Sequence, residues 1–245
     1  MHFSRSLLAL SVAALLAMPL PATASPAAPA PLTLGEQFIV RAYAGQLEAL
    51  AVSKVIKAQT LGIAVNNSTI CVALAGSLAG GFVASNKDDG LAATKAGEPP
   101  VRRLDIVAYN QPSDATNAVG SFKDKDAIAL LFGGQVSEAD NYASVRNTLV
   151  ELAKVDYSGA IFLHLTVAAK KWVEKAATED KAVAAYLTKK NNVYALAVNV
   201  EQKKGFVNQL SFKDGKQNVA KAAFETALND GFLDLFKRRL IAPAI

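Results

Sequence analysis

The feature that most constrains the fold is the stretch from Ile161 to Leu240, in which the spacing of apolar residues follows a recognisable pattern over most of its length. Side chains of a β-strand point alternately to its two faces, so a period of two predicts a half-buried strand. The alternation predicts three strands, over residues 161–168, 193–200 and 206–212. A polar loop, Gln202–Gly205, joins the last two and predicts an antiparallel hairpin.

The segment after the third strand has the spacing of a helix. Asp214-Gly215 predicts a turn, and apolar residues then recur every three or four positions as far as Phe236. Asn229-Asp230-Gly231 interrupts the pattern, which leaves one bent helix or two short helices open. This C-terminal amphipathic helix, packed across the strands, predicts an α+β fold with an antiparallel β-meander in the C-terminal half.

Residues 176–190 support two interpretations. Val183, Ala185 and Leu187 alternate with their neighbours, which favours a fourth strand paired with the strand at Tyr194. The Ala, Glu and Lys content of the same segment also permits a helix.

The N-terminal half is predicted to be mixed, helical in part and glycine-rich in part. Thr33 and Glu36 have the spacing of a capping box at the start of a helix over residues 34–58. Ser137 is placed to cap a second helix that runs to about Val155. A short strand is expected over 61–65, a strand or a helix over 101–108 and over 126–132, and loops over 86–100 and 110–120.

The uncharged stretch from Ile70 to Ser85 stands out because Gly76 and Gly80 lie four residues apart. We expect a buried helix or glycine-rich loop here, with Cys71 as a buried small apolar residue. Contact with a membrane through Ile70–Ser85, or packing between copies, is the alternative, because small residues at this spacing let helices approach closely. The stretch is shorter than the roughly 20 residues of a typical membrane span.

The N-terminus has the pattern of a secretory signal peptide over residues 1–24. Arg5 precedes an apolar run, Leu7–Leu20, and Ala22-Thr23-Ala24 resembles a cleavage site. Residues 25–33 are rich in Pro and Ala and predict a disordered leader. Cys71 is the only cysteine and lies far from the cleavage site, so there is no lipobox. We therefore expect a periplasmic or secreted protein.

The rest of the chain, residues 34–245, is predicted to form a single α+β domain, with lobes 34–135 and 136–245 as the alternative division. The full chain has 26 basic and 21 acidic residues, and Arg5 is the one basic residue of the predicted signal peptide, so the balance is too even to predict a nucleic-acid partner. Lys237, Arg238 and Arg239 are interpreted as a solvated helix end.

Catalytic signatures are missing from the sequence. His164 is the one histidine after the signal peptide, and no H-E-x-x-H, paired-cysteine or G-x-S-x-G motif accompanies it. We interpret His164 as a partly buried residue hydrogen-bonded in the sheet. The carboxylate pairs, such as Asp124 and Asp126, lie in charged, turn-like segments. We therefore predict no catalytic, cofactor-binding or metal-binding residues and no cofactor.

Part of the chain resembles bacterial cell-envelope proteins and lipoproteins of largely unknown function. The matching segments are Asp156-Tyr157-Ser158-Gly159-Ala160, Phe206–Gly215 and the glycine-rich Ala75–Phe82. The resemblance implies an envelope location and no activity. We expect an exported, non-enzymatic protein that binds an envelope protein or joins an envelope assembly. The alternative is a periplasmic hydrolase whose site is not visible in the sequence.

Overall fold

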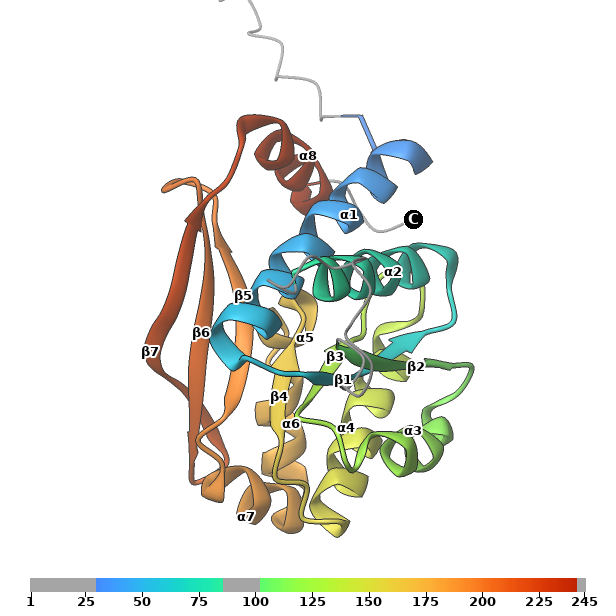
Figure 1. Ribbon diagram of the computed structural model, residues 1–245, viewed down its shortest axis with the longest axis vertical. Coiled ribbons are helices and arrows are strands. Elements are labelled where there is room, and N and C mark those ends of the chain that lie inside the picture. Colours follow the sequence, from blue (N-terminus) through green and yellow to red (C-terminus); the bar gives the residue numbers. More distant parts are fainter. Residues whose placement is uncertain (1–29, 86–101, 242–245) are drawn as a thin grey trace, which may run out of the picture.

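The computed structural model describes residues 30–85 and 102–241. The predicted signal peptide, residues 25–29 of the leader and the loop over 86–100 lie outside these residues. The described chain forms one seven-stranded sheet in the order β2-β1-β3-β4-β5-β6-β7 (Figure 1). The pairing of β3 with β4 crosses the division considered between the two lobes, so both parts of the chain build one sheet.

The strands β1 to β5 run parallel to one another, β6 runs antiparallel to β5, and β7 runs antiparallel to β6. Parallel strands require crossover connections, usually helices, so the fold is α/β rather than the predicted α+β. The expected antiparallel hairpin is confirmed, since β6 pairs with β5 and β7 pairs with β6. The strands are β1 Thr60–Asn66, β2 Arg103–Tyr109, β3 Ala127–Leu131, β4 Ala160–Leu163, β5 Val193–Asn199, β6 Lys204–Lys213 and β7 Lys216–Ala227.

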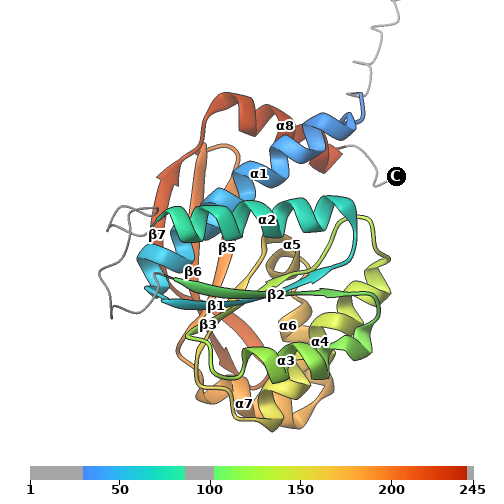
Figure 2. The ribbon, with the colours of Figure 1, turned by 45° about the vertical axis from the view of Figure 1, so that its right-hand side comes forward.

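Helices cover both faces of the parallel part of the sheet (Figure 2). One face carries α1 Leu34–Leu50, its π-helical extension Ala51–Ile56 and α2 Thr69–Ala84. The other carries α3 Ala115–Phe122, α4 Glu138–Lys154, α6 Trp172–Glu179 and α7 Lys181–Lys189. A 3₁₀ turn, Pro112–Asp114, precedes α3, and the short helix α5, Leu165–Ala169, follows β4. The last helix, α8 Asp230–Ile241, packs on α1.

The helix α2 is the expected buried element, and Cys71 is buried as predicted. The helices α2 and α1 cross closely, and the missing side chain of Gly81 allows this approach. A Cβ on Gly81 would lie 2.7 Å from the Cβ of Ala49. Gly76 and Gly80, the pair that stands out in the sequence, face open space instead. In the part of the chain that the structure describes, no helix combines the length and apolar character that a membrane crossing needs.

The first predicted strand of the C-terminal half is shorter than expected. It ends at Leu163, and residues 165–169 form α5 instead of continuing the strand to residue 168. The helical interpretation of residues 176–190 is correct and the strand interpretation is wrong. The Asp180 side chain accepts hydrogen bonds from the backbone N–H groups of Ala182 and Val183, so it caps α7 and favours a helix over the alternation.

The segment predicted as the start of the C-terminal helix is in fact the edge strand β7, and the helix begins only at Asp230. Two irregularities in the β6–β7 register disturb the period of two: Leu210 pairs with Val219, whereas Val207 pairs with Phe224. The apolar residues of β7 are therefore spaced unlike those of a regular strand.

Several N-terminal elements agree with the prediction. Thr33 and Glu36 form the capping box of α1, Ser137 caps α4, and β1 lies where the short strand was expected. The loop predicted over 110–120 is wrong, because α3 forms there and buries Ala118, Val119 and Phe122 against the sheet.

Candidate functional site

A cavity of about 310 Å³ opens beside the carboxyl ends of β3 and β4. Gly133 and Gly134 follow β3 and His164 follows β4, and both segments line the cavity. Ligands of open α/β sheets bind outside the carboxyl ends of the strands, where the strand order reverses. In this sheet the reversal lies between β1 and β3. The cavity therefore lies at the carboxyl edge of the parallel strands, beside β3 and β4 and next to the reversal rather than at it.

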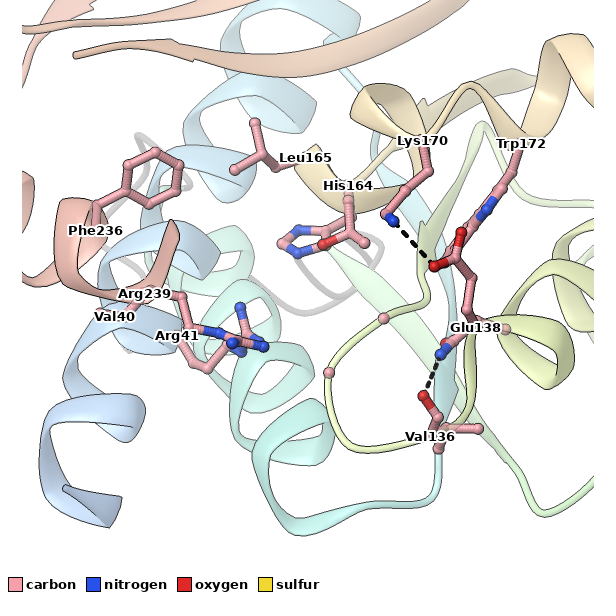
Figure 3. Close-up of a pocket in the computed structure, with 14 residues that line it drawn as sticks. Val40, Arg41, Val136, Glu138, His164, Leu165, Lys170, Trp172, Phe236 and Arg239 are labelled. Carbon is pink, nitrogen blue, oxygen red and sulfur yellow. Dashed lines mark hydrogen bonds and ion pairs between the residues drawn. The ribbon is translucent and has the colours of Figure 1, made fainter. Parts of the chain in front are cut away.

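Arg41 of α1 and Arg239 of α8 both reach into this cavity (Figure 3). Burial lowers the pKa of the Arg41 guanidinium, and the charge of Arg239 lowers it further, although Cys71 and Glu48 act in the opposite direction. Among residues 30–85 and 102–241, neither guanidinium has an ion pair or hydrogen bond. The two arginines thus bring positive charge to the cavity, and no carboxylate of the described residues pairs with either of them.

The helix pair α1–α8 holds these arginines in place. Arg238 Nη1 lies 2.6 Å from Glu36 Oε1, and this hydrogen bond lowers the pKa of Glu36 to about 2. Beside it, Leu32, Val40, Phe232 and Phe236 form a small apolar cluster. The basic end of α8 is therefore not simply solvated, as the sequence suggested, because Arg238 pairs with α1 and Arg239 lines the cavity.

The third cation at the cavity already has a partner. Lys170 Nζ lies 2.9 Å from Glu138 Oε2, and both side chains are largely exposed. This pair sits on the opposite wall from the arginines in Figure 3. The charge available to a ligand consequently comes from Arg41 and Arg239.

His164 joins a carboxylate at the inner end of the cavity. Its Nδ1 lies 2.5 Å from Oε1 of Glu48, which α1 contributes from 116 positions away. The histidine is 3% exposed and the glutamate 0% exposed. The other oxygen of the glutamate, Oε2, is buried and has no hydrogen-bond partner in the described chain. His164 is hydrogen-bonded as expected, but it lies at the end of a strand and its partner is a helix residue.

The turn after β3 brings backbone close to the cavity. Gly133 and Gly134 have φ values of 140° and 82°, which residues with a side chain rarely adopt. A Cβ on Gly134 would lie 3.0 Å from the sulfur of Cys71 and 3.7 Å from Nη2 of Arg41. The Cys71 thiol donates a hydrogen bond of 3.0 Å to the Gly133 carbonyl. Gly134 therefore lets the loop pack directly against Cys71 and Arg41, and Gly133 lets it pack against Thr166.

A family model described as "Uncharacterized protein" matches residues 37–235. The chain belongs to this family. No curated protein matches it. Among solved structures, the leucine-binding protein LivK of Thermotoga maritima is similar at 12% identity with a TM-score of 0.42. The match covers 74% of this chain and 65% of LivK, so the chain spans less than two thirds of the length of that protein.

Three carboxylates that have an acidic neighbour in the sequence, Asp126, Glu179 and Asp180, make structural contacts. Asp126 accepts hydrogen bonds of 2.8 Å from the N–H groups of Gln59 and Thr60, which ties the starts of β1 and β3 together. Glu179 accepts from Tyr142, and Asp180 caps α7. Within residues 30–85 and 102–241, no group of three or more His, Cys, Asp or Glu side chains could hold a metal ion.

Sequence reasoning missed Arg41, Glu48 and Arg239. One signal was available: Glu48 falls on the buried face of α1, four and eight positions after the apolar residues Ala44 and Val40. A carboxylate on the apolar face of a helix needs a partner, because an unpaired buried charge is costly. No spacing along the chain, however, identifies His164 as that partner.

Proposed function

We propose that the protein is a non-enzymatic binding protein that holds a small organic anion in the cavity between Arg41 and Arg239. The observation that carries this proposal is the pair of half-buried guanidinium groups without a carboxylate partner in the described chain. Guanidinium groups bind carboxylate and phosphate oxygens through charge-assisted hydrogen bonds. An anion bound there would offset both their burial and their mutual repulsion.

The other residues that line the cavity indicate the chemical character of the rest of the ligand. Val40, Leu165, Trp172 and Phe236 offer apolar surface, and the cavity of about 310 Å³ is near the lower end of the usual range for small-molecule sites. We propose an anionic head, carboxylate or phosphate, on a short apolar body.

We also propose that the protein is exported and that it binds an envelope protein. The edge strand β7 supports a protein partner, because most of its residues are exposed and Val219 is 61% exposed. Unpaired edge strands can add a strand from another chain.

A hydrolase remains the second candidate, and the observation that favours it is the buried Glu48–His164 pair. A carboxylate that orients an imidazole is a common arrangement in general-base catalysis. Turnover of a simple ester such as p-nitrophenyl butyrate, abolished by His164→Gln, would favour the hydrolase over the binding protein.

Isothermal titration calorimetry tests the binding proposal with three probes: hexanoate, hexyl phosphate and the uncharged hexanol. We expect at least one of the two anions to bind and hexanol not to bind. Arg41→Gln and Arg239→Gln should each weaken the binding of that anion by about tenfold or more, since a hydrogen bond to a charged group contributes roughly 1.5–3 kcal/mol.

The matched control is Lys237→Gln, which removes an exposed cation from the same helix. It should leave the affinity within about twofold of wild type. The proposal fails if neither anion binds, if hexanol binds as tightly as the anions, or if the control weakens binding as much as Arg239→Gln.

A further inference from the structure

We infer that His164 is a third donor to the bound anion and that it donates as the imidazolium, so that binding of the anion takes up a proton. This inference rests on the proposed function. It assigns a binding role to His164 and a positioning role to Glu48.

The two ring nitrogens of His164 have different surroundings. Nδ1 is held by Glu48 at 2.5 Å, whereas Nε2 has no hydrogen bond to the described residues. The ring lines the cavity, which Figure 3 shows between Leu165 and Lys170. Nε2 is therefore the nitrogen available to an anion, and the carboxylate on the opposite nitrogen fixes the orientation of the ring.

Several charged groups surround the imidazole ring of His164. Arg41 and Glu48 belong to α1, Arg239 to α8, and Cys71 to α2, close to Arg41. Glu138 of α4 and Lys170 pair with each other on the remaining side. Glu48 stabilises an imidazolium, whereas the two arginines oppose it.

A bound anion changes this balance, because it neutralises the arginines and accepts a hydrogen bond from Nε2. Anion and proton then stabilise each other, and by linkage each raises the affinity for the other. Because Nδ1 is already bonded to Glu48, Nε2 carries a proton to donate only in the imidazolium form, and a bound anion favours that form. The affinity should therefore rise as the pH falls.

Hexanoate is the suitable probe, because carboxylic acids of this kind ionise near about pH 4–5 and stay ionised above pH 6. The second ionisation of a phosphate monoester, at about pH 6, would overlap with that of the imidazole. Wild-type protein should bind hexanoate about fivefold to tenfold more tightly at pH 6 than at pH 8. Calorimetry in buffers of different ionisation heat should show proton uptake.

His164→Gln should bind hexanoate with an affinity that changes less than twofold between pH 6 and pH 8, without proton uptake. Glu48→Gln keeps the shape of the positioning residue and removes its charge. It should move the pH dependence to lower pH, which a merely structural role for Glu48 would not do.

Nitrogen-15 NMR of histidine-labelled wild type provides a readout that does not depend on the folding of a variant. The chain has only two histidines, His2 and His164, so the signals are few. Saturating hexanoate at pH 7 should move the Nε2 signal of His164 toward the imidazolium position.

The outcomes separate the two proposals. Absence of hexanoate and hexyl phosphate binding at either pH would overturn the proposed function. Arginine-dependent hexanoate binding with an unchanged Nε2 signal, or with the same pH dependence in folded His164→Gln as in wild type, would overturn the role of His164 alone.

Discussion

At the scale of single residues, Arg239 is the clearest case of a side chain placed for a ligand rather than for stability. It lies beside Arg41 at the cavity, and the two charges repel in protein without a bound anion. We predict that Arg239→Gln raises the free energy of unfolding by about 0.5–1 kcal/mol at low salt. Urea denaturation should show this gain shrinking as salt screens the charges. A loss of stability would mean that the Arg239 guanidinium has a stabilising partner.

At the scale of the helix, the α1–α2 crossing depends on glycines at the contact, Gly45 of α1 and Gly81 of α2, and not on Gly80. A Cβ on Gly81 would lie 2.7 Å from Ala49, whereas a Cβ on Gly80 meets nothing within 4 Å. Gly81→Ala should therefore lower the free energy of unfolding by about 1–3 kcal/mol through overpacking. Gly80→Ala is the matched control and should raise it by up to about 1 kcal/mol, because Ala favours a helix. Equal effects of the two substitutions in thermal or urea denaturation would contradict this packing.

The contact between α1 and α8 should depend on pH. The hydrogen bond from Arg238 lowers the pKa of Glu36 to about 2, from its ordinary value of 4.5. A pKa that is lower in the folded than in the unfolded state stabilises the fold at pH values above the unfolded-state pKa. For Glu36 this contribution is lost as the pH falls from about 4.5 to about 2. Melting temperatures of wild type and Glu36→Gln should differ above pH 5 and converge toward pH 2.

The control for that experiment is Glu201→Gln, since Glu201 is exposed and has no ion pair in the described chain. Its difference from wild type should be small at every pH. If the Glu36→Gln difference does not depend on pH, the pair with Arg238 does not contribute to stability.

At the scale of the whole molecule, local chemistry predicted elements better than it predicted their arrangement. The capping residues Thr33 and Ser137 identified two helices, and alternation identified β5 and β6. The parallel arrangement was harder, because β1 and β3 are covered on both faces and read as apolar runs without a period. Since the pairing of β4 with β3 was not visible either, the pattern indicated an antiparallel α+β fold.

The candidate site could not be assembled from the sequence, because its residues come from distant elements. No motif in the sequence accompanies His164, because its partner Glu48 lies 116 positions away. Arg41 and Arg239 meet only because α8 packs on α1. Sites at the ends of parallel strands are built in this way, so strand order has to be known before the site is visible.

The most direct test of the anion site is a crystal structure of the full chain with 6-bromohexanoate, located by the anomalous signal of bromine. We predict a bromine peak inside the cavity and the carboxylate of the ligand within hydrogen-bond distance of both Arg41 and Arg239. An empty cavity at saturating ligand, or arginines paired with carboxylates of the protein itself, would contradict the account.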